Sequence, residues 1–521
     1  MRRRLKQLAL SVIATTSLAP MLASGDDDKD YFGKDRNEDF GMFVERKLNN
    51  RSKQLFGVKE PLNESAPETT GAYRTATQKA EAQVLLADGL HVEYLTRNAG
   101  NETDMMDFFP LHKPTHLITC VEGAREQLTG DADKTKYAAG DKFNPAVQRI
   151  SLSDGKVETI LRGMTRCDGI RTTPWGTILI TEETTDGGAY EILNPLKTTN
   201  FTVFDRATGV IVDTDGKENA VEIAKRAALP TMAWEGIAVL ASGVVIAGDE
   251  LRPGSIDLDG DKKPENDTDG GAIFKFVPQV PRSGDGLITA LAQSPFASGA
   301  VHALQVSCQD NIQQYGQGCE IGNAAWISVN AATARTDANK NGATGYYRPE
   351  DLHDDPLYKD AENALAVRVC WTNTGNEDGK NYAEVVCAVD SEPLIADPTK
   401  RTVVANRFVE GDTDFNSFDN LAFQPKTGNL YVIEDHDNGD IFACLRDGED
   451  RDIKSDGCVK ILSVKDSSAE PTGFIFAPDG ETAYLSIQHS DDTNAGAVGK
   501  FDGYATDDLL KITGFKIRKG H

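Results

Sequence analysis

Four stretches of the chain share one pattern, in which a glycine-containing turn leads into a short apolar strand with a polar or acidic end. These stretches are residues 175–183, 242–250, 428–435 and 480–489. β-Branched and aromatic residues fill the runs, as is typical of strands. No long segment with helical periodicity separates them, which disfavours a parallel α/β sheet. The sequence therefore predicts an all-β fold.

Many antiparallel strands in loosely similar units favour a β-propeller, in which equivalent strands surround one channel. If the four runs are equivalent strands, their polar ends lie toward one face of the molecule: Glu182, Glu183, Asp249, Glu250, Glu434, Asp435 and His489. A ring of carboxylates is costly unless cations balance it. The alternative is that several of these residues cap turns at the rim.

The first 25 residues have the features of an export signal. Arg2, Arg3, Arg4 and Lys6 precede an apolar stretch at residues 8–22, which is short and interrupted for a membrane span. The arginines fit a twin-arginine signal, and an ordinary secretory signal fits as well. We expect a periplasmic or extracellular protein without integral membrane association after signal removal.

The remaining chain divides by its texture. Residues 26–107 are polar and loosely patterned, with weak helical signals at 37–51 and 77–86, and they are predicted to form an N-terminal arm or cap. Residues 108–521 carry the strand pattern and are predicted to form the propeller.

The charge balance limits the partners. Asp and Glu number 81 against 55 Lys and Arg, which gives a formal net charge of -26. Such a field repels nucleic acid, and it also repels a phosphate ester unless bound cations reverse the local sign. We expect a monomer that binds a small molecule and no nucleic acid.

Eight cysteines, an even number, fit an oxidising compartment. Three pairs bracket short loops and are predicted to form local disulfides: Cys308 with Cys319, Cys370 with Cys387, and Cys444 with Cys458. Cys120 and Cys167 remain.

One loop has the composition of a structural calcium site. Its alternating carboxylates and a glycine supply oxygen ligands that could wrap a hard cation: Asp257, Asp259, Asp261, Asp267 and Asp269. The alternative is an exposed acidic loop without an ion.

Four segments together resemble the PhoX-type alkaline phosphatases and related secreted proteins, over roughly residues 110–500. The segments are residues 166–177 with the pair at 182–183, residues 234–236, residues 347–350, and residues 418–423 followed by 476–480 and 487–489. The Thr-Pro-Trp-Gly-Thr run at 173–177 and the Arg-Pro-Glu triplet at 348–350 are the most specific parts. The resemblance implies a six-bladed propeller with calcium and iron at one end of its channel, in an exported phosphomonoesterase.

The resemblance also implies roles for individual residues. Cys167 becomes the thiolate that bridges the irons, Arg348 the residue that grips the phosphate, and the carboxylates become metal ligands: Glu182, Glu183, Glu235 and Glu350. Clustered cations neutralise the ester and activate an oxygen nucleophile. An arginine offers paired hydrogen bonds to a phosphoryl group, although Arg348 is alternatively a structural partner of Asp351 or Asp354.

The chain departs from the family pattern around the cysteine, which is closer to Asn-Cys-Ala-Gly-Gly in the family. Here Arg166 precedes Cys167, and Asp168 and Ile170 replace small residues. Cys120 is an available disulfide partner, and an oxidised Cys167 could not bind iron as a thiolate. The sequence leaves both states of Cys167 open.

Two other functions remain open from the sequence. Residues 418–423 and 428–431 also resemble gluconolactonase-like propellers, which implies one cation held by Glu235, Asn420 and Asp435 in a lactone or ester hydrolase. The third possibility is a non-catalytic propeller that calcium and disulfides stabilise and that binds a surface or extracellular partner. A disulfide between Cys120 and Cys167 together with an empty channel would favour this third function.

Overall fold

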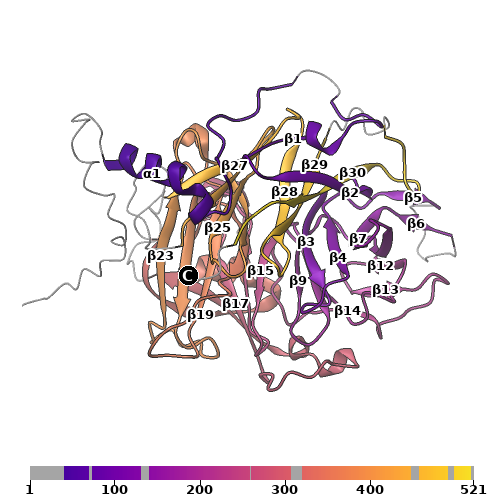
Figure 1. Cartoon of the computed structure of the whole chain (residues 1–521). Coiled ribbons are helices and arrows are strands. Elements are labelled where there is room, and N and C mark those ends of the chain that lie inside the picture. The colour runs from indigo at the N-terminus through magenta and orange to yellow at the C-terminus, as the bar shows by residue number, and fades with distance from the viewer. Residues whose placement is uncertain are drawn as a thin grey trace, which may run out of the picture.

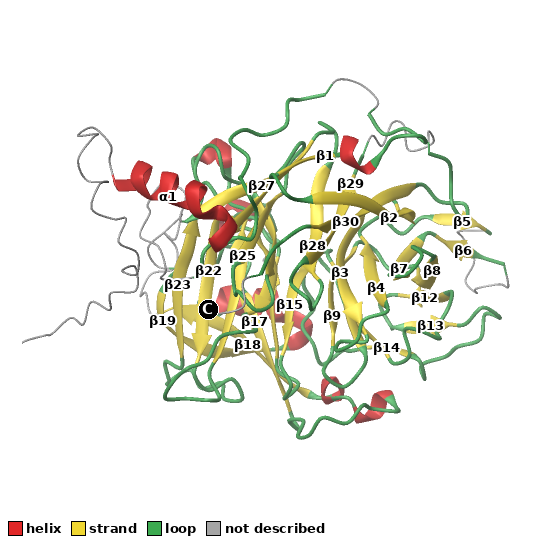
Figure 2. Cartoon of the chain, viewed as in Figure 1, coloured by secondary structure: helices red, strands yellow, loops and turns green. Residues whose placement is uncertain are grey.

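The computed structural model describes residues 40–69, 73–130, 140–258, 260–306, 320–446, 457–490 and 498–517. Strands dominate these residues, as Figure 2 shows, and the all-β prediction is confirmed. Helix α1 (Phe40–Leu55) contacts an outer strand, and helix α2 (Ala334–Lys340) packs beside two other strands. Within the described ranges, no helix has the length and apolar character needed to cross a bilayer. The predicted export signal at 1–25 lies outside these ranges.

Inner strands line the centre of the molecule, and each contacts the next around a closed ring. They are β3 (Thr103–Phe109), β9 (Cys167–Thr172), β15 (Trp234–Val239), β20 (Pro349–Asp354), β24 (Phe418–Phe423) and β28 (Glu470–Phe476). Because every inner strand begins a sheet that extends outward, equivalent residues of different sheets meet at the same end of the ring.

Each inner strand pairs antiparallel with a second strand. These are β4 (His116–Val121), β10 (Ile178–Glu182), β16 (Val245–Asp249), β21 (Val367–Asn373), β25 (Leu430–Glu434) and β29 (Thr482–Gln488). The four sequence runs that share a pattern are β10, β16, β25 and β29. Their predicted equivalence is therefore confirmed.

The outer strands complete four separate sheets and one large one. The six-stranded sheet adds β7 (Pro145–Ser151), β8 (Val157–Arg162), β12 (Phe201–Asp205) and β13 (Val210–Val212), and one four-stranded sheet adds β11 (Ala189–Ile192) and β14 (Ile223–Lys225). The five-stranded sheet adds β26 (Asp440–Cys444), β27 (Cys458–Val464) and β1 (Val84–Leu86), and the other four-stranded sheet adds β30 (Thr506–Thr513) and β2 (His91–Gly100). The short strands β5 (Gln127–Thr129) and β6 (Lys142–Phe143) form a separate pair.

The prediction of six separate blades is wrong. Four sheets have blade size, and a single nine-stranded sheet runs from β15 to β20 through β17 (Ile273–Pro278), β18 (Gly299–Val306), β19 (Gly322–Val329), β23 (Val403–Glu410) and β22 (Glu384–Asp390). The cause is the pairing of β19 with β23 at the outside, which makes one sheet continuous. Its two end strands also contact each other, so this sheet is nearly closed.

The N-terminal boundary predicted at residue 107 falls inside β3. Strand β1 pairs with β27, and β2 pairs along its length with β30 from the other end of the chain. Figure 1 shows the indigo strand β2 beside the yellow strand β30. This pairing joins the two ends of the chain in one sheet, so residues 84–107 belong to the β-fold and not to an arm.

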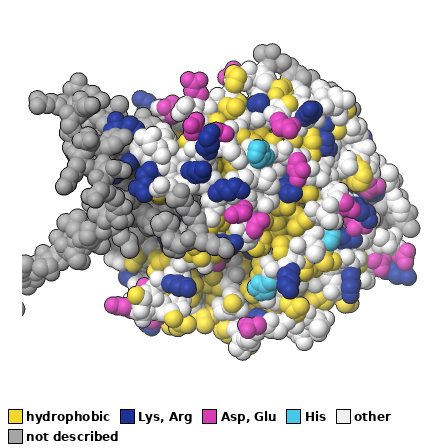
Figure 3. All heavy atoms as spheres, in the orientation of Figure 1, with side chains coloured by type: hydrophobic (Ala, Val, Ile, Leu, Met, Phe, Trp, Pro, Cys, Tyr) yellow, Lys and Arg dark blue, Asp and Glu magenta, His cyan; other side chains and the backbone are white. Residues whose placement is uncertain are grey.

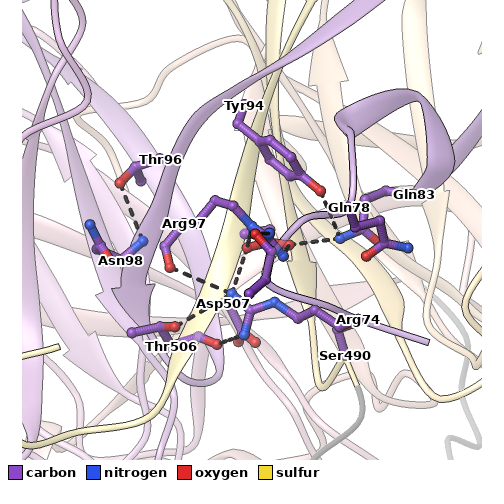
Figure 4. Close-up of polar contacts among 12 residues, drawn as sticks. Arg74, Gln78, Gln83, Tyr94, Thr96, Arg97, Asn98, Ser490, Thr506 and Asp507 are labelled. Carbon is purple, nitrogen blue, oxygen red and sulfur yellow. Dashed lines mark hydrogen bonds and ion pairs between the residues drawn. The ribbon is translucent and has the colours of Figure 1, made fainter. Parts of the chain in front are cut away.

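A buried ion pair joins the segment before β2 to the same sheet, and Figure 4 labels Arg74, Gln83 and Arg97 in this region. Arg74 Nη2 lies 2.5 Å from Asp508 Oδ1 on β30, and both side chains are buried. Gln83 Nε2 donates to Asp508 Oδ2 at 2.7 Å, and Arg97 pairs with the same carboxylate. Three residues from the N-terminal part of the chain therefore contact Asp508.

Arg74→Ala is expected to lower the free energy of unfolding by about 3 kcal/mol, because it leaves the buried Asp508 without one of its cationic partners. Urea unfolding followed by circular dichroism measures the change. Lys59→Ala is the matched control, since its pair with Asp88 is exposed and exposed pairs contribute little to stability. Equal losses in the two variants would contradict the structural role of Arg74.

Three disulfides lie within the described ranges. Two of them, Cys370–Cys387 and Cys444–Cys458, were predicted from the loops they bracket and are confirmed. The third joins Cys120 to Cys167. The predicted pair of Cys308 and Cys319 lies outside the described residues. These bonds fit an oxidising compartment.

Candidate metal centre

A carboxylate stands at the start of every inner strand. We call these residues the inner tier: Asp104, Asp168, Glu235, Glu350, Asp419 and Glu470. The first five occupy the second position of their strands, where the pairing with the second strand shifts register. A β-bulge re-aims a side chain and bends the strand. The repeated bulges thus bring the carboxylates together at one end of the ring.

A second set of side chains follows the second strands by one residue. We call these residues the outer tier: Glu122, Glu183, Glu250, Thr374, Asp435 and His489. Contacts among the described residues join the tiers. Thr374 Oγ1 donates to Glu350 Oε1 at 2.5 Å, His489 Nε2 lies 3.4 Å from Glu470 Oε1, and Arg348 bridges Glu250 to Glu350.

Three of the second strands end in an acidic residue whose described partners are not residues of either tier, in keeping with the alternation of successive side chains along a strand. Glu182 Oε1 lies 2.7 Å from Arg206 Nε, and Asp249 pairs with Arg335. Glu434 accepts the backbone N–H groups of residues 416 and 440. The prediction that Glu182 is a metal ligand is therefore not supported, whereas its neighbour Glu183 joins the centre.

Three overlapping groups of carboxylates are spaced for metal ions. Within each group, one oxygen of every residue lies within 4.8 Å of the others. The groups are Asp104 with Glu122 and Asp168, then Asp168 with Glu183 and Glu235, then Glu235 with Glu350 and Asp419. Asp168 and Glu235 are each shared by two groups. Oxygen donors of this kind suit hard cations such as calcium.

The electrostatics of the centre are also compatible with bound cations. Burial, followed by the repulsion of neighbouring carboxylates, raises the pKa of Asp168 and of Glu235 well above the usual range. The same causes raise the pKa of Glu183 to about 12. Clustered carboxylates without a counter-charge hold protons instead of charge. A bound cation would replace those protons, so the donor set fits metal ions.

Two arginines stand at the centre, each directly before an inner strand. Arg166 precedes β9 and Arg348 precedes β20, and both have a left-handed backbone, with φ of 50° and 53°. Non-glycine residues adopt this conformation rarely, and such strain gathers at functional sites. Arg166 pairs with Glu122 and with Glu183, whereas Arg348 pairs with Glu250, Glu350 and Asp435.

The partners of Arg348 differ from the structural alternative considered from the sequence. Its Nε lies 2.6 Å from Glu250 Oε1, and its Nη2 lies 3.0 Å from Glu350 Oε1 and 3.3 Å from Asp435 Oδ2. Asp351 instead pairs with His353 and Arg171. Arg348 therefore lies at the centre, beside a candidate metal ligand.

The sequence missed several residues of the centre: Asp104, Glu122, Asp168, Glu250 as a partner of Arg348, and Asp419. A signal exists in hindsight, because Asp168, Glu235, Glu350 and Asp419 each follow the first residue of an inner strand. It is weak in sequence, since it consists only of an acidic residue followed two positions later by isoleucine or leucine. The pattern can be recognised only once the inner strands are known to be equivalent.

Other predicted site residues do not join these groups. Cys167 forms a disulfide with Cys120, so it is not a thiolate ligand in this structure. For the lactonase-type set, Asn420 Oδ1 accepts Thr472 Oγ1 at 2.7 Å and the N–H of Gly473, while Asp435 pairs with Arg348. Neither Asn420 nor Asp435 shares a contact with Glu235 among the described interactions.

The predicted calcium loop uses its carboxylates for backbone turns. Asp257 accepts the N–H groups of Gly260 and Lys262, and Asp267 accepts that of Leu258. Asp261 accepts the N–H of residue 263, while Asp269 lies near the Asp249–Arg335 pair. Asp259 lies outside the described residues. The calcium site at this loop stays a prediction.

The most specific family motif is structural. Trp175 is fully buried, and its Nε1 donates to Glu191 Oε1 at 2.9 Å. Thr177 Oγ1 donates to the same oxygen at 2.6 Å, and Arg226 neutralises the carboxylate. The motif thus fixes the turn between β9 and β10, whose ends carry Asp168 and Glu183.

Comparisons with solved structures agree with this architecture. PhoX from Pseudomonas fluorescens, solved with the transition-state analogue vanadate, matches with a TM-score of 0.50 at 16% identity, over 85% of this chain and 97% of that chain. Weaker likenesses include a candidate gluconolactonase, with a TM-score of 0.39 at 10% identity over 84% of this chain and 97% of that chain. An aldose sugar dehydrogenase from Streptomyces coelicolor has a TM-score of 0.36 at 10% identity, over 82% and 99% of the two chains.

No curated protein sequence matches the chain. The family comparison is decisive, since the model for alkaline phosphatase PhoX matches residues 122–491, which hold most of the carboxylates of both tiers and Arg348. The chain therefore belongs to the PhoX family of alkaline phosphatases, which are metal-dependent phosphoric monoester hydrolases.

Proposed function

We propose that this chain is an exported phosphomonoesterase whose centre is the double tier of carboxylates with Arg348. The observation that carries the proposal is the overlap of the three carboxylate groups through Asp168 and Glu235, with Arg348 Nη2 3.0 Å from the neighbouring Glu350. Membership of the family indicates the reaction class, and the two tiers of carboxylates are the proposed site of that reaction. The substrate is a small phosphate ester.

Calcium is the proposed cation, because every candidate ligand offers oxygen. Calcium would be bound by Glu183, Glu235 and Glu350, which were inferred from the resemblance. Four further carboxylates would also bind it: Asp104, Glu122, Asp168 and Asp419. Bound cations would supply charge neutralisation and an activated oxygen for attack on phosphorus. Iron was the second metal inferred from the resemblance, and the disulfide at Cys167 does not fit its thiolate ligand.

Arg348 has the proposed role of binding and orienting the phosphoryl group. Its guanidinium group lies among Glu250, Glu350 and Asp435, and its left-handed backbone directs it there. Cations bound by Glu350 would compete for that carboxylate and leave the N–H groups of Arg348 for phosphate oxygens. Donors fixed in advance stabilise the charge that develops in the transition state.

Elemental analysis and a chromogenic phosphomonoester assay, with and without the chelator EGTA, test the proposal. We expect bound calcium and turnover that EGTA removes and calcium restores. Calcium without turnover would overturn the phosphatase and leave a calcium-stabilised propeller that binds a partner. Hydrolysis of a lactone in place of the phosphomonoester would favour the lactonase-type alternative.

Glu183→Gln and Glu182→Gln are expected to separate the two neighbouring glutamates. Glu183→Gln should weaken calcium binding at least about tenfold, since removal even of supporting groups has effects of that size. Glu182→Gln should leave calcium binding unchanged and lower the stability by about 2 kcal/mol, because it removes a charged hydrogen bond to Arg206. Calorimetric titration and urea unfolding measure both variants, and equal calcium affinities would contradict this assignment.

The surface and the disulfides support the remaining proposals. On the face drawn in Figure 3, Lys and Arg side chains are interspersed with Asp and Glu. Interspersed charges and a net charge of -26 do not favour nucleic acid. We propose a monomer in the periplasm or outside the cell, where the disulfides persist.

A further inference from the structure

Cys167 and Asp168 are neighbours on β9, yet their side chains reach opposite environments. Cys167 bonds to Cys120, and both cysteines are fully buried in an apolar cluster between two sheets. Asp168 instead joins two of the three carboxylate groups. Because consecutive strand residues point to opposite sides, the backbone that aims Asp168 at the centre turns Cys167 away from it.

One carboxylate oxygen of Asp168 has no hydrogen-bond partner in the part of the chain that the structure describes. The residue is 3% exposed, and its Oδ1 atom is buried without a hydrogen-bond partner among the described residues. Buried polar atoms normally have a partner, and an exception points to an ion or water at that atom. The orphaned oxygen and the shared position between two groups together indicate a bridging metal ligand.

The disulfide has a different role from a ligand. Cys120 lies two residues before Glu122, and Cys167 lies one residue before Asp168. The bond therefore links β4 to β9 close in sequence to Glu122 and Asp168, the two carboxylates that share a group with Asp104. It fixes the distance between Glu122 and Asp168 and leaves no thiolate for a metal.

We infer that this chain has an all-oxygen metal centre in which Asp168 bridges two divalent cations and Cys167 serves as half of a structural crosslink. The inference deepens the proposed phosphatase and rests on it for the use of the centre. It predicts calcium, or manganese in its place, without an iron–thiolate unit. Carboxylate oxygens select hard cations, whereas thiolates select softer ones.

Metal titration of the purified, metal-free protein tests the bridging ligand. Asp168→Asn is expected to lose at least about tenfold in calcium affinity, with fewer ions bound per chain by elemental analysis. The double variant Cys120→Ala/Cys167→Ala removes no ligand oxygen and should therefore lose less calcium affinity than Asp168→Asn, whereas the control Cys370→Ala/Cys387→Ala should keep the wild-type affinity. An unchanged affinity in Asp168→Asn would overturn the inference.

A second measurement does not depend on any variant folding. Alkylation without reductant, followed by peptide mass spectrometry, should recover Cys120 and Cys167 as one linked, unalkylated pair. Protein exposed to ferric citrate should develop no visible charge-transfer band of an iron–thiolate bond. Alkylated Cys167 together with such a band would overturn the inference.

The metal centre and the phosphatase activity are tested separately by these measurements. If phosphomonoester turnover is absent while Asp168→Asn still loses calcium, the metal centre stands and the phosphatase fails. If turnover is present but Cys167 is free and binds iron, the phosphatase stands and the all-oxygen centre fails.

Discussion

Arg348→Ala is expected to lower kcat/KM for a phosphomonoester by about 10²- to 10³-fold, which is typical for loss of one fixed donor to a transition-state oxyanion. The loss should fall mainly on kcat, because Arg348 strengthens its contact as charge develops on the phosphoryl oxygens. Arg348→Lys should recover little of it, since an ammonium group cannot form the paired hydrogen bonds of a guanidinium group. Steady-state kinetics on calcium-loaded protein measure both variants.

The calcium affinity of the same variants separates this role from a structural one. Arg348 carries a positive charge next to Glu250, Glu350 and Asp435, so its removal leaves those carboxylates more attractive to a cation. Arg348→Ala should therefore bind calcium at least as tightly as the wild type while turnover falls. Arg206→Ala, which removes the partner of Glu182, is the control and should keep its turnover. Parallel losses of calcium and turnover in Arg348→Ala would contradict the phosphate-binding role.

Four of the second strands could be predicted from the sequence, because each of these four is a short apolar run that follows a glycine-containing turn. β10, β16, β25 and β29 were found in this way. The blade count could not be predicted, since it depends on whether β19 pairs with β23 across a long sequence separation. The same limit applies to β2, whose partner β30 lies at the opposite end of the chain. Local patterns contain no information about such pairings.

The candidate site was predictable only in part for a related reason. Glu183, Glu235 and Glu350 were inferred from the resemblance, and the structure brings them into adjoining groups. Glu182 was included because the sequence cannot tell which of two neighbouring glutamates follows the strand end. Cys167 was a thiolate candidate through the resemblance, and the sequence also offered Cys120 as its disulfide partner without deciding between the two states. Asp168 was noted only as a departure from the family pattern, although its geometry makes it central.

The stability of the metal-free protein is expected to fall as the pH rises from 5 to 8, and calcium should remove most of this dependence. Burial and mutual repulsion raise the folded-state pKa values of Asp168, Glu235 and Glu350 above their usual range, and that of Glu183 to about 12. Unfolded carboxylic acids ionise near pH 4, at about 3.9 to 4.3. Above that pH the folded state holds more protons than the unfolded state, so the free energy of unfolding decreases as pH rises.

The expected size follows from linkage. Each extra proton held by the folded state lowers the stability by about 1.4 kcal/mol per pH unit, or about 4 kcal/mol between pH 5 and 8. Thermal unfolding with EGTA and with calcium measures the two curves. The pKa of His436 is raised to about 9 by its hydrogen bond to Glu434, so this residue also makes the protein less stable as the pH rises. This contribution is expected both with EGTA and with calcium. The difference between the curves therefore isolates the carboxylate centre.

Glu235→Gln tests this dependence, because its expected effect on stability has one sign with EGTA and the opposite sign with calcium. Glutamine mimics the protonated glutamic acid of the metal-free centre, and it has no proton to lose in the unfolded chain. The variant should match the wild type near pH 4 and exceed its stability at pH 8 when EGTA is present. With calcium present the order should reverse, because the variant lacks a carboxylate shared by two metal groups. A variant less stable than the wild type in both conditions would mean that Glu235 is a structural residue, since only a metal ligand stabilises the protein through the cation that it holds.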